Sequence, residues 1–406
     1  MSRTALSRAC YYMRRPHITV AVCICAVLSV PAIRYIESLR CNTFYEMNEP
    51  NARATPLQIA PTIPGHVIFD RDSLGWMRRH LQPPPDKPVS ASFCLHLLRL
   101  YGKNATFQHP TLKTGDTILA VLTNDTASAS FFGAPHSLRT TYGVRFPSDK
   151  SESGRTALEV DAHRDHTLAV LSELGVPLSF PVTVNNERLS LSEVLKDSIA
   201  TFHLQQKELA WTATAYILLL PPHREWTNRF GERFTFDQLI SELLSRPLHK
   251  DSCSGTHLLV ALTLAARAND INSFLTEPMR LRLHRFLDAA VTAACETQQA
   301  DGSWLPTWNR ALHESASPPR SATIDGPIDR LLVTGHLTEW LLYLPRQHQP
   351  HLSTFERAAK WLQAELVKAL PTKDDAVLCP YAHAFGVLQT LSPDMPPALP
   401  HPTADG

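Results

Sequence analysis

The sequence predicts an all-α fold, namely an α/α toroid of about six helical hairpins. Three observations predict it: strongly apolar segments alternate with amphipathic ones, proline-containing connections separate them, and three apolar segments begin alike around one histidine. A helix that is apolar all round must be buried on all sides, whereas an amphipathic helix faces water on one side. Alternating the two kinds closes into a ring with the apolar helices inside. A right-handed α-solenoid of helix pairs is the alternative.

Composition narrows the function classes. The 406 residues are 44% apolar and 19% charged, with a net charge of +1, so a full core is expected and no basic field points to nucleic acid. The 32 prolines against 15 glycines suit helices joined by rigid connections more than β-hairpins, which use Gly and Asn at their turns. The eight cysteines form no Cys-x-x-Cys pair, and a disulfide-built scaffold is not expected.

The N-terminal region has the pattern of a membrane anchor. Four arginines within residues 1–16 precede an apolar run, which predicts a single transmembrane signal-anchor at 17–36. The arginine excess places residues 1–16 in the cytoplasm and the remainder in an extracytoplasmic (periplasmic) compartment. A cleaved signal peptide, with Val30-Pro31-Ala32 as its cleavage site, is the alternative.

The rest of the chain divides by composition. Residues 37–90 are proline-rich and predict a stalk with one short helix near 74–81; residues 91–391 predict the toroid; residues 392–406 predict a disordered tail. Within the toroid, proline or glycine ends most segments, and Ser190 with Glu193 has the spacing of a capping box. The apolar, inner helices are expected at 92–101, 164–174, 208–220, 253–266, 331–344 and 379–391. The amphipathic, outer helices are expected at 115–123, 190–203, 235–244, 279–298 and 354–370.

Three of the inner helices share a histidine in a similar setting. The segments read Ser-Gly-Thr-His-Leu-Leu, Val-Thr-Gly-His-Leu-Thr and Pro-Tyr-Ala-His-Ala-Phe, around His257, His336 and His383. We interpret them as the same helix in successive repeats, with the histidine in its first turn. Equivalent helices of a ring present equivalent positions to one axis, so these histidines, together with His166, are expected to converge on one cavity.

Cysteine and glutamate accompany these histidines at helical spacing. Cys253 and Cys379 each lie four residues before a histidine, and Glu339 lies three residues after His336. Thiolate and imidazole suit Zn²⁺, so Cys253, His336 and His383 are candidate metal ligands. His336, Glu339, His257 and His383 are candidate catalytic residues, with the glutamate orienting a ligand or acting as a base. The alternative is that the histidines are neutral core residues bonded to adjoining loops and the cysteines small core residues.

One turn resembles a known superfamily. Residues 298–304 read Gln-Gln-Ala-Asp-Gly-Ser-Trp, which is similar to the Gln-x-x-x-Gly-x-Trp motif of the terpenoid cyclase and protein prenyltransferase superfamily. The resemblance implies an α/α toroid in which Gln298 caps a helix end and Trp304 stacks beneath it. It also implies that Trp304→Ala destabilises the domain by about 3–5 kcal/mol, as for a buried aromatic residue.

The chain departs from that superfamily in its chemical motifs. The acidic Asp-x-Asp-Asp motif of squalene cyclases is absent, and Asp374-Asp375 is the nearest approach. Asp251-Ser252-Cys253 has the Asp-x-Cys form of the prenyltransferase zinc site, with His336 or His383 as a third ligand. Three functions stay open: an enzyme acting on, or a protein binding, an apolar isoprenoid-type ligand from the membrane; a non-catalytic scaffold; and a carbohydrate lyase or hydrolase that uses Glu339 and a histidine.

Overall fold

The chain is predominantly helical, so the predicted all-α class is confirmed. The computed structural model describes residues 51–392, apart from 64, 66, 68, 88, 149–162, 224, 313–325 and 375–376. All elements given below belong to one compact unit, residues 49–228 and 233–406. Its thirteen described α-helices are α3 (Arg71–His80), α4 (Ala91–Tyr101), α5 (Gly115–Thr123), α6 (Asp125–Phe132), α7 (His166–Glu173), α8 (Leu191–Ala200), α9 (Leu209–Leu219), α10 (Phe236–Ser245), α11 (Thr256–Ile271), α12 (Glu277–Thr297), α13 (Pro327–Tyr343), α14 (Leu352–Ala369) and α15 (Cys379–Leu391).

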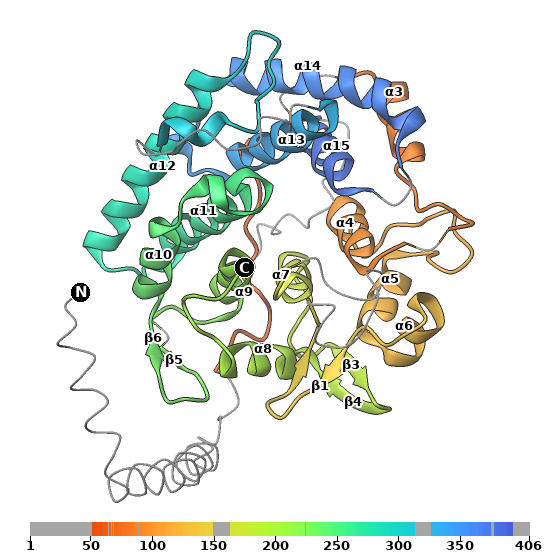
Figure 1. Cartoon of the computed structure of the whole chain (residues 1–406), viewed down its shortest axis with the longest axis vertical. Coiled ribbons are helices and arrows are strands. Elements are labelled where there is room, and N and C mark those ends of the chain that lie inside the picture. The colour runs from red at the N-terminus through yellow and green to blue at the C-terminus, as the bar shows by residue number, and fades with distance from the viewer. Residues whose placement is uncertain are drawn as a thin grey trace, which may run out of the picture. The chain divides into compact units, whose positions relative to one another are not determined.

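Six helices form the inner layer of this unit. They are α4, α7, α9, α11, α13 and α15, and in α9 every residue is buried. Each of them contacts the next one in this order, and α15 in turn contacts α4 (Figure 1). Their sequences are apolar on all faces because each has neighbours on all sides.

Five helices cover the inner layer from outside. Each of α5, α8, α10, α12 and α14 contacts the inner helix that precedes it in the chain (Figure 1). In α14 the buried residues recur at helical spacing, as in Phe355, Ala359, Leu362 and Leu366, while charged residues such as Arg357 and Lys360 are exposed on the opposite side. Among the described residues, buried helices and amphipathic helices thus follow each other along the chain.

Most helix boundaries fall where the sequence predicts them, and the exceptions have local causes. Helices α5 and α15 match at both ends. Helix α13 begins four residues early, because Pro327 occupies its first position, where a missing N–H costs nothing. Ser190 caps nothing with its side chain, contrary to the predicted capping box, because its hydroxyl bonds Ser192. Thr235 and Gln238 form a capping box instead, at the start of α10.

The described residues contain three short β-hairpins that the sequence analysis did not expect, because it took the composition to disfavour them. They are β1 (Leu138–Arg139) with β2 (Val144–Arg145), β3 (Pro181–Val184) with β4 (Glu187–Ser190), and β5 (Trp226–Thr227) with β6 (Arg233–Phe234). The turn between β3 and β4 is Asn185-Asn186, both with left-handed backbone (φ 53° and 64°). Asparagine tolerates this conformation, so a tight hairpin forms there without glycine.

The described residues between positions 51 and 90 pack against the helices, which corrects the predicted stalk. We call residues 51–63 the strap. Its backbone N–H groups at Arg53, Leu57 and Thr62 donate to carbonyls at the C-terminal ends of α9 and α13, at 2.7–2.8 Å. These are carbonyls that a helix leaves without internal partners, so the strap supplies hydrogen bonds that two inner helices need. Helix α3 follows, with Leu74 and Met77 buried.

The turn at residues 298–304 is tightly built, in a way that differs from the expectation. Trp304 is fully buried, and its Nε1 donates to the Ala294 carbonyl at the end of α12 at 2.7 Å. Gln298 occupies the C-cap position of α12, but its side-chain amide donates to the carbonyls of Gly302 and, in α14, Thr354, both at 3.0 Å. Gly302 has φ +97°, and a Cβ there would lie 2.4 Å from a backbone oxygen of α14. The turn therefore fixes α12 against α14.

Several predictions fall outside the described residues. These are the cytoplasmic segment 1–16, the signal-anchor 17–36, residues 37–50 of the stalk and residues 393–406 of the tail. Among residues that the structure describes, no helix combines the length and the apolar character needed to cross a bilayer.

Candidate functional site

Each inner helix contributes one aromatic side chain to a common centre. We call this set the central cluster: His96 (α4), His166 (α7), Trp211 (α9), His257 (α11), His336 (α13) and His383 (α15). Going round in that order and back to His96, neighbouring ring centroids lie 6.0, 4.3, 4.8, 5.5, 3.6 and 5.4 Å apart. All six side chains are buried. The predicted convergence of His166, His257, His336 and His383 is confirmed.

The predicted position of these histidines within their helices is only partly right. His166 is the first residue of α7 and His257 the second of α11. His383 lies one turn into α15, and His336 lies near the middle of α13, because that helix extends further toward its N-terminus than the sequence suggested. The histidines are thus equivalent in the direction they face, toward the central cluster, but not in their distance from the start of the helix.

Two cysteines join the cluster from one side. Cys379 is the first residue of α15, and Cys253 lies in the 3-10 turn η3 (Ser252–Gly255) that leads into α11. Donor atoms of Cys253, His336 and Cys379 all lie within 4.8 Å of one another, and so do those of His96, Cys379 and His383. Cys379 belongs to both groups. We call these five side chains the sulfur site.

Backbone strain accompanies Cys253. Cys253, Ser254 and Gly255 all have left-handed backbone, with φ of 50°, 57° and 82°. Such a conformation at a residue other than glycine costs on the order of 1–3 kcal/mol and persists where the surroundings impose it. A Cβ at position 255 would also meet the Leu248 carbonyl oxygen at 2.7 Å, so this turn requires glycine. The strain motivates a functional interpretation of the turn.

The three imidazoles of the sulfur site are held in one tautomer. Nδ1 of His96 lies 2.7 Å from the Ser92 carbonyl oxygen, Nδ1 of His336 lies 3.1 Å from that of Leu332, and Nδ1 of His383 lies 2.5 Å from the Glu339 carboxylate. These oxygens only accept, so each Nδ1 carries the hydrogen and each Nε2 carries a lone pair. Nε2 of His336 is buried without a hydrogen-bond partner.

Burial keeps two of these imidazoles in the form that binds metals. It lowers the pKa of His96 to about 4 and that of His383 to about 3, so both are neutral at pH 7. A hydrogen bond from Cys379 lowers the pKa of Cys253, while the same contact raises that of Cys379. The contact thus favours the thiolate form at Cys253, which is the form that binds metals.

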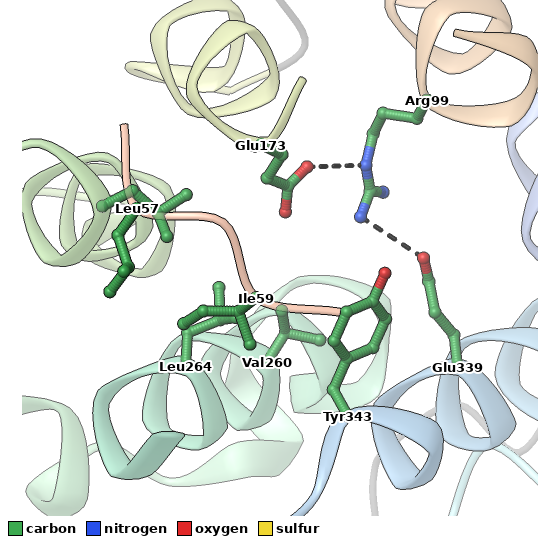
Figure 2. A pocket seen from close by; sticks show the side chains of 9 residues that line it. Leu57, Ile59, Arg99, Glu173, Val260, Leu264, Glu339 and Tyr343 are labelled. Atoms are coloured by element: carbon green, nitrogen blue, oxygen red, sulfur yellow. Dashed lines mark hydrogen bonds and ion pairs between the residues drawn. The ribbon is translucent and has the colours of Figure 1, made fainter. Parts of the chain in front are cut away.

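A charged layer lies beside the cluster (Figure 2). Arg99, one turn after His96, donates to Glu173 at 2.8 Å and to Glu339 at 3.3 Å. Burial would raise the pKa of Glu339, but His383 and Arg99 outweigh it and hold the carboxyl pKa below its ordinary value. Glu339 is thus a fixed carboxylate between an arginine and a histidine. These charged residues also line a pocket whose opposite wall is apolar and includes Leu57 and Ile59 of the strap.

Sequence reasoning found part of this site. Cys253, His257, His336, Glu339 and His383 lie together, as their spacing suggested. His96, Arg99 and Glu173 were not among the residues that the sequence placed at the site. The signal that marks them is His96 followed three residues later by Arg99, which matches the spacing of His336 and Glu339 on another inner helix.

Comparisons with known proteins add no relative. No protein-family model, no curated protein and no solved structure matches the chain. The similarity of residues 298–304 to the terpenoid cyclase motif therefore stays a prediction, and the function has to be argued from the geometry of the site.

Proposed function

We propose that the chain is a metal-binding protein whose sulfur site holds one ion of the Zn²⁺ class. Cys253, Cys379 and His336 are the first three ligands, and His383 completes a tetrahedral set. The observation that carries the proposal is the orientation of the imidazoles: each Nδ1–H is bound by an oxygen, and each Nε2 lone pair is left for another partner. Metal-binding histidines are oriented in this way by carboxylates and backbone carbonyls.

The donor types select the kind of metal. Thiolate and imidazole suit Zn²⁺ and other borderline or soft ions, and disfavour Mg²⁺ and Ca²⁺, which prefer oxygen. The Glu339 carboxylate accepts from Nδ1–H of His383, as carboxylates do behind zinc-bound histidines, and Arg99 fixes it from the other side. The buried Nε2 of His336 would lose hydrogen-bonding capacity without a partner, a cost of about 1–3 kcal/mol that a bound ion removes.

Metal analysis of the purified full chain tests this proposal. We expect about one tightly bound zinc at the sulfur site, lost in Cys253→Ser and in Cys379→Ser and retained in the control Cys295→Ser, whose thiol is exposed on α12. If Cys253→Ser and Cys379→Ser both kept the zinc content of the unmodified chain, the proposal would be refuted. Mass analysis under non-reducing conditions distinguishes a Cys253–Cys379 disulfide, which would exclude these thiols as metal ligands.

For the architecture, we propose the α/α toroid of the terpenoid cyclase type. Two observations support it. Each of the six inner helices contacts the next one along the chain and α15 contacts α4, and the aromatic side chains of the central cluster contact one another in the same order. The signal-anchor at 17–36 and an extracytoplasmic domain remain part of the proposal. Protease added to spheroplasts, or the equivalent cell preparation, is expected to digest the domain; full protection would contradict the orientation.

An apolar or isoprenoid-type ligand is the second candidate, and the pocket beside the charged layer favours it. Leu57, Ile59, Leu218, Val260 and Leu264 form its apolar wall. An isoprenoid alcohol added to the full chain is expected to raise its melting temperature, and Val260→Asn is expected to remove that effect. An unchanged melting temperature of the unmodified chain would count against this candidate.

The geometry gives less support to a carbohydrate lyase or hydrolase. That function would need Glu339 as an acid or base, and its carboxylate is already engaged by Arg99 and His383. The low pKa of Glu339 also makes it a weak base.

A further inference from the structure

A second group of donors lies on the other side of the central cluster. His163 lies three residues before the start of α7, Glu208 is the N-cap residue of α9, and His257 lies in the first turn of α11. One donor atom from each lies within 4.8 Å of the other two. The rings of His163 and His257 are 5.1 Å apart, and Nδ1 of His163 lies 3.3 Å from Oε2 of Glu208. The three residues belong to the N-terminal ends of neighbouring inner helices.

Two atoms of this group are buried without hydrogen bonds. Nδ1 of His257 has no hydrogen-bond partner, and the whole residue is only 9% exposed. Oε2 of Glu208 is buried as well, and its contact with His163 lacks hydrogen-bond geometry. The other carboxylate oxygen, Oε1, accepts from the Ser252 hydroxyl at 2.5 Å. Unpartnered buried groups of this kind are costly, and both residues belong to the group whose donor atoms lie within 4.8 Å of one another.

Both atoms are available to a ligand. Glu208 carries a negative charge, because His163 and Ser252 hold its pKa below the ordinary value against the effect of burial. Nδ1 of His257 has no partner that fixes a hydrogen on it, so a metal ion would select the tautomer in which Nδ1 carries the lone pair. An unbonded imidazole nitrogen and an unbonded carboxylate oxygen are both features that attract a cation.

We propose that His163, Glu208 and His257 form a second metal site, for a divalent transition ion such as Zn²⁺. Two imidazoles and one carboxylate are a donor set of zinc sites that keep a fourth position for water or a substrate oxygen. The side chains of His163 and Glu208 are 21% and 23% exposed, against 5% for His383 in the sulfur site. Solvent therefore reaches part of the second site, as it does the half-buried Cys253 and Cys379 of the sulfur site. A water, carboxylate or phosphate oxygen is the class of ligand that fits the fourth position of the second site.

The second site extends the proposed function, but it uses different ligands, so each can fail alone. The test is Co²⁺ and Zn²⁺ stoichiometry on the metal-free full chain, with Co²⁺ absorption as the second readout. A thiolate ligand gives a near-ultraviolet charge-transfer band, which a site made of two histidines and a glutamate lacks. We expect two ions per chain in the unmodified protein. Glu208→Gln is expected to bind one ion with the charge-transfer band intact, and Cys379→Ser one ion without it.

Each other outcome has a defined meaning. One ion in the unmodified chain, lost in Cys379→Ser and kept in Glu208→Gln, would overturn the second site and leave the proposed function standing. One ion lost in Glu208→Gln and kept in Cys379→Ser would do the reverse, and no bound ion would refute both. His163→Gln is the second variant if Glu208→Gln fails to fold. Glu193→Gln is the matched control, because this glutamate on α8 makes only partly exposed ion pairs away from the cluster.

Discussion

The two sides of the central cluster are built differently. Toward α4, α13 and α15, each histidine has its Nδ1–H bound by an oxygen acceptor. Toward α7, α9 and α11, Nδ1 of His166, Nε1 of Trp211 and Nδ1 of His257 are all buried without hydrogen-bond partners. The first side is oriented by the protein itself, as a preformed ligand set is. The second contains polar atoms that the described residues leave unsatisfied, which is the expected state of a site completed from outside.

The difference shows how a core can be polar and still be specified. Buried polar groups fix a structure when they are bonded and destabilise it when they are not. On the bonded side a chain runs from Glu173 through Arg99 and Glu339 to His383. It links α7, α4, α13 and α15, so the alignment of the ligands depends on the packing of four helices. No comparable chain orients His166 or His257 among the described residues.

Metal removal is expected to have the largest effect on the stability of the chain. If it had no effect, neither side of the central cluster would be a metal site, and the comparison between them would lose its basis. A ligand present at 1,000 times its dissociation constant stabilises the folded state by about 4 kcal/mol. Prolonged chelation of the full chain should therefore lower its thermal melting temperature, and added Zn²⁺ should restore it. The double variant Cys253→Ser/Cys379→Ser should lose the part of this response that the sulfur site contributes. An identical chelator response in the double variant would show that the thiols bind no metal.

The second prediction concerns the carboxylate that orients the bonded side. Glu339→Gln keeps the size of the side chain but removes the charge that faces Nδ1 of His383. Loss of such an outer partner typically weakens metal affinity about 10–100-fold. Competition with a chromophoric chelator measures this change. Glu173→Gln is the matched control. Glu173 also binds Arg99 but has no hydrogen bond to a histidine of the sulfur site in the described part of the chain. Equal losses of affinity in both variants would contradict a specific role for Glu339.

The sequence predicted the helical framework well because the helices follow from local patterns. The alternation of apolar and amphipathic segments located the six inner helices and their five outer partners, and proline marked their ends. The hairpins were missed since their strands are only two to four residues long, and β3–β4 turns on asparagine instead of glycine. The strap was misread because its proline content suggested a stalk, whereas its hydrogen bonds go to distant helix ends that a local pattern cannot reveal.

The site was predictable only where a sequence repeat carried it. Small residues precede His257, His336 and His383 alike, and this likeness predicted that the three would converge. The two cysteines were found because each lies four residues before one of these histidines. The role of Arg99 depends on contacts with residues 74 and 240 positions away, and Glu208 meets His163 only through the packing of α9 against α7. Such pairs become visible once the helices are placed in three dimensions.

The smallest effect concerns two buried tryptophans, one with a bonded indole N–H and one without. Nε1 of Trp304 donates to the Ala294 carbonyl at 2.7 Å, whereas Nε1 of Trp211 has no hydrogen-bond partner. Replacement by phenylalanine shrinks both side chains and removes both N–H groups. At Trp304 it also breaks a buried hydrogen bond, worth about 1 kcal/mol. At Trp211 it removes an unsatisfied donor, which offsets part of the packing loss.

We therefore expect Trp304→Phe to lower the free energy of unfolding by about 1 kcal/mol more than Trp211→Phe does. Denaturant unfolding of the metal-free chain measures both, since bound metal would mask the contribution of the central cluster. The metal-loaded chain sharpens the result. The ring of Trp211 packs at a tilt against those of His166 and His257, with centroids 4.3 and 4.8 Å apart, so its replacement should weaken binding at the second site while Trp304→Phe leaves it unchanged. Equal destabilisation by the two substitutions would mean that the indole N–H of Trp211 is hydrogen-bonded as well as that of Trp304. The proposed difference between the two sides of the central cluster would then be wrong.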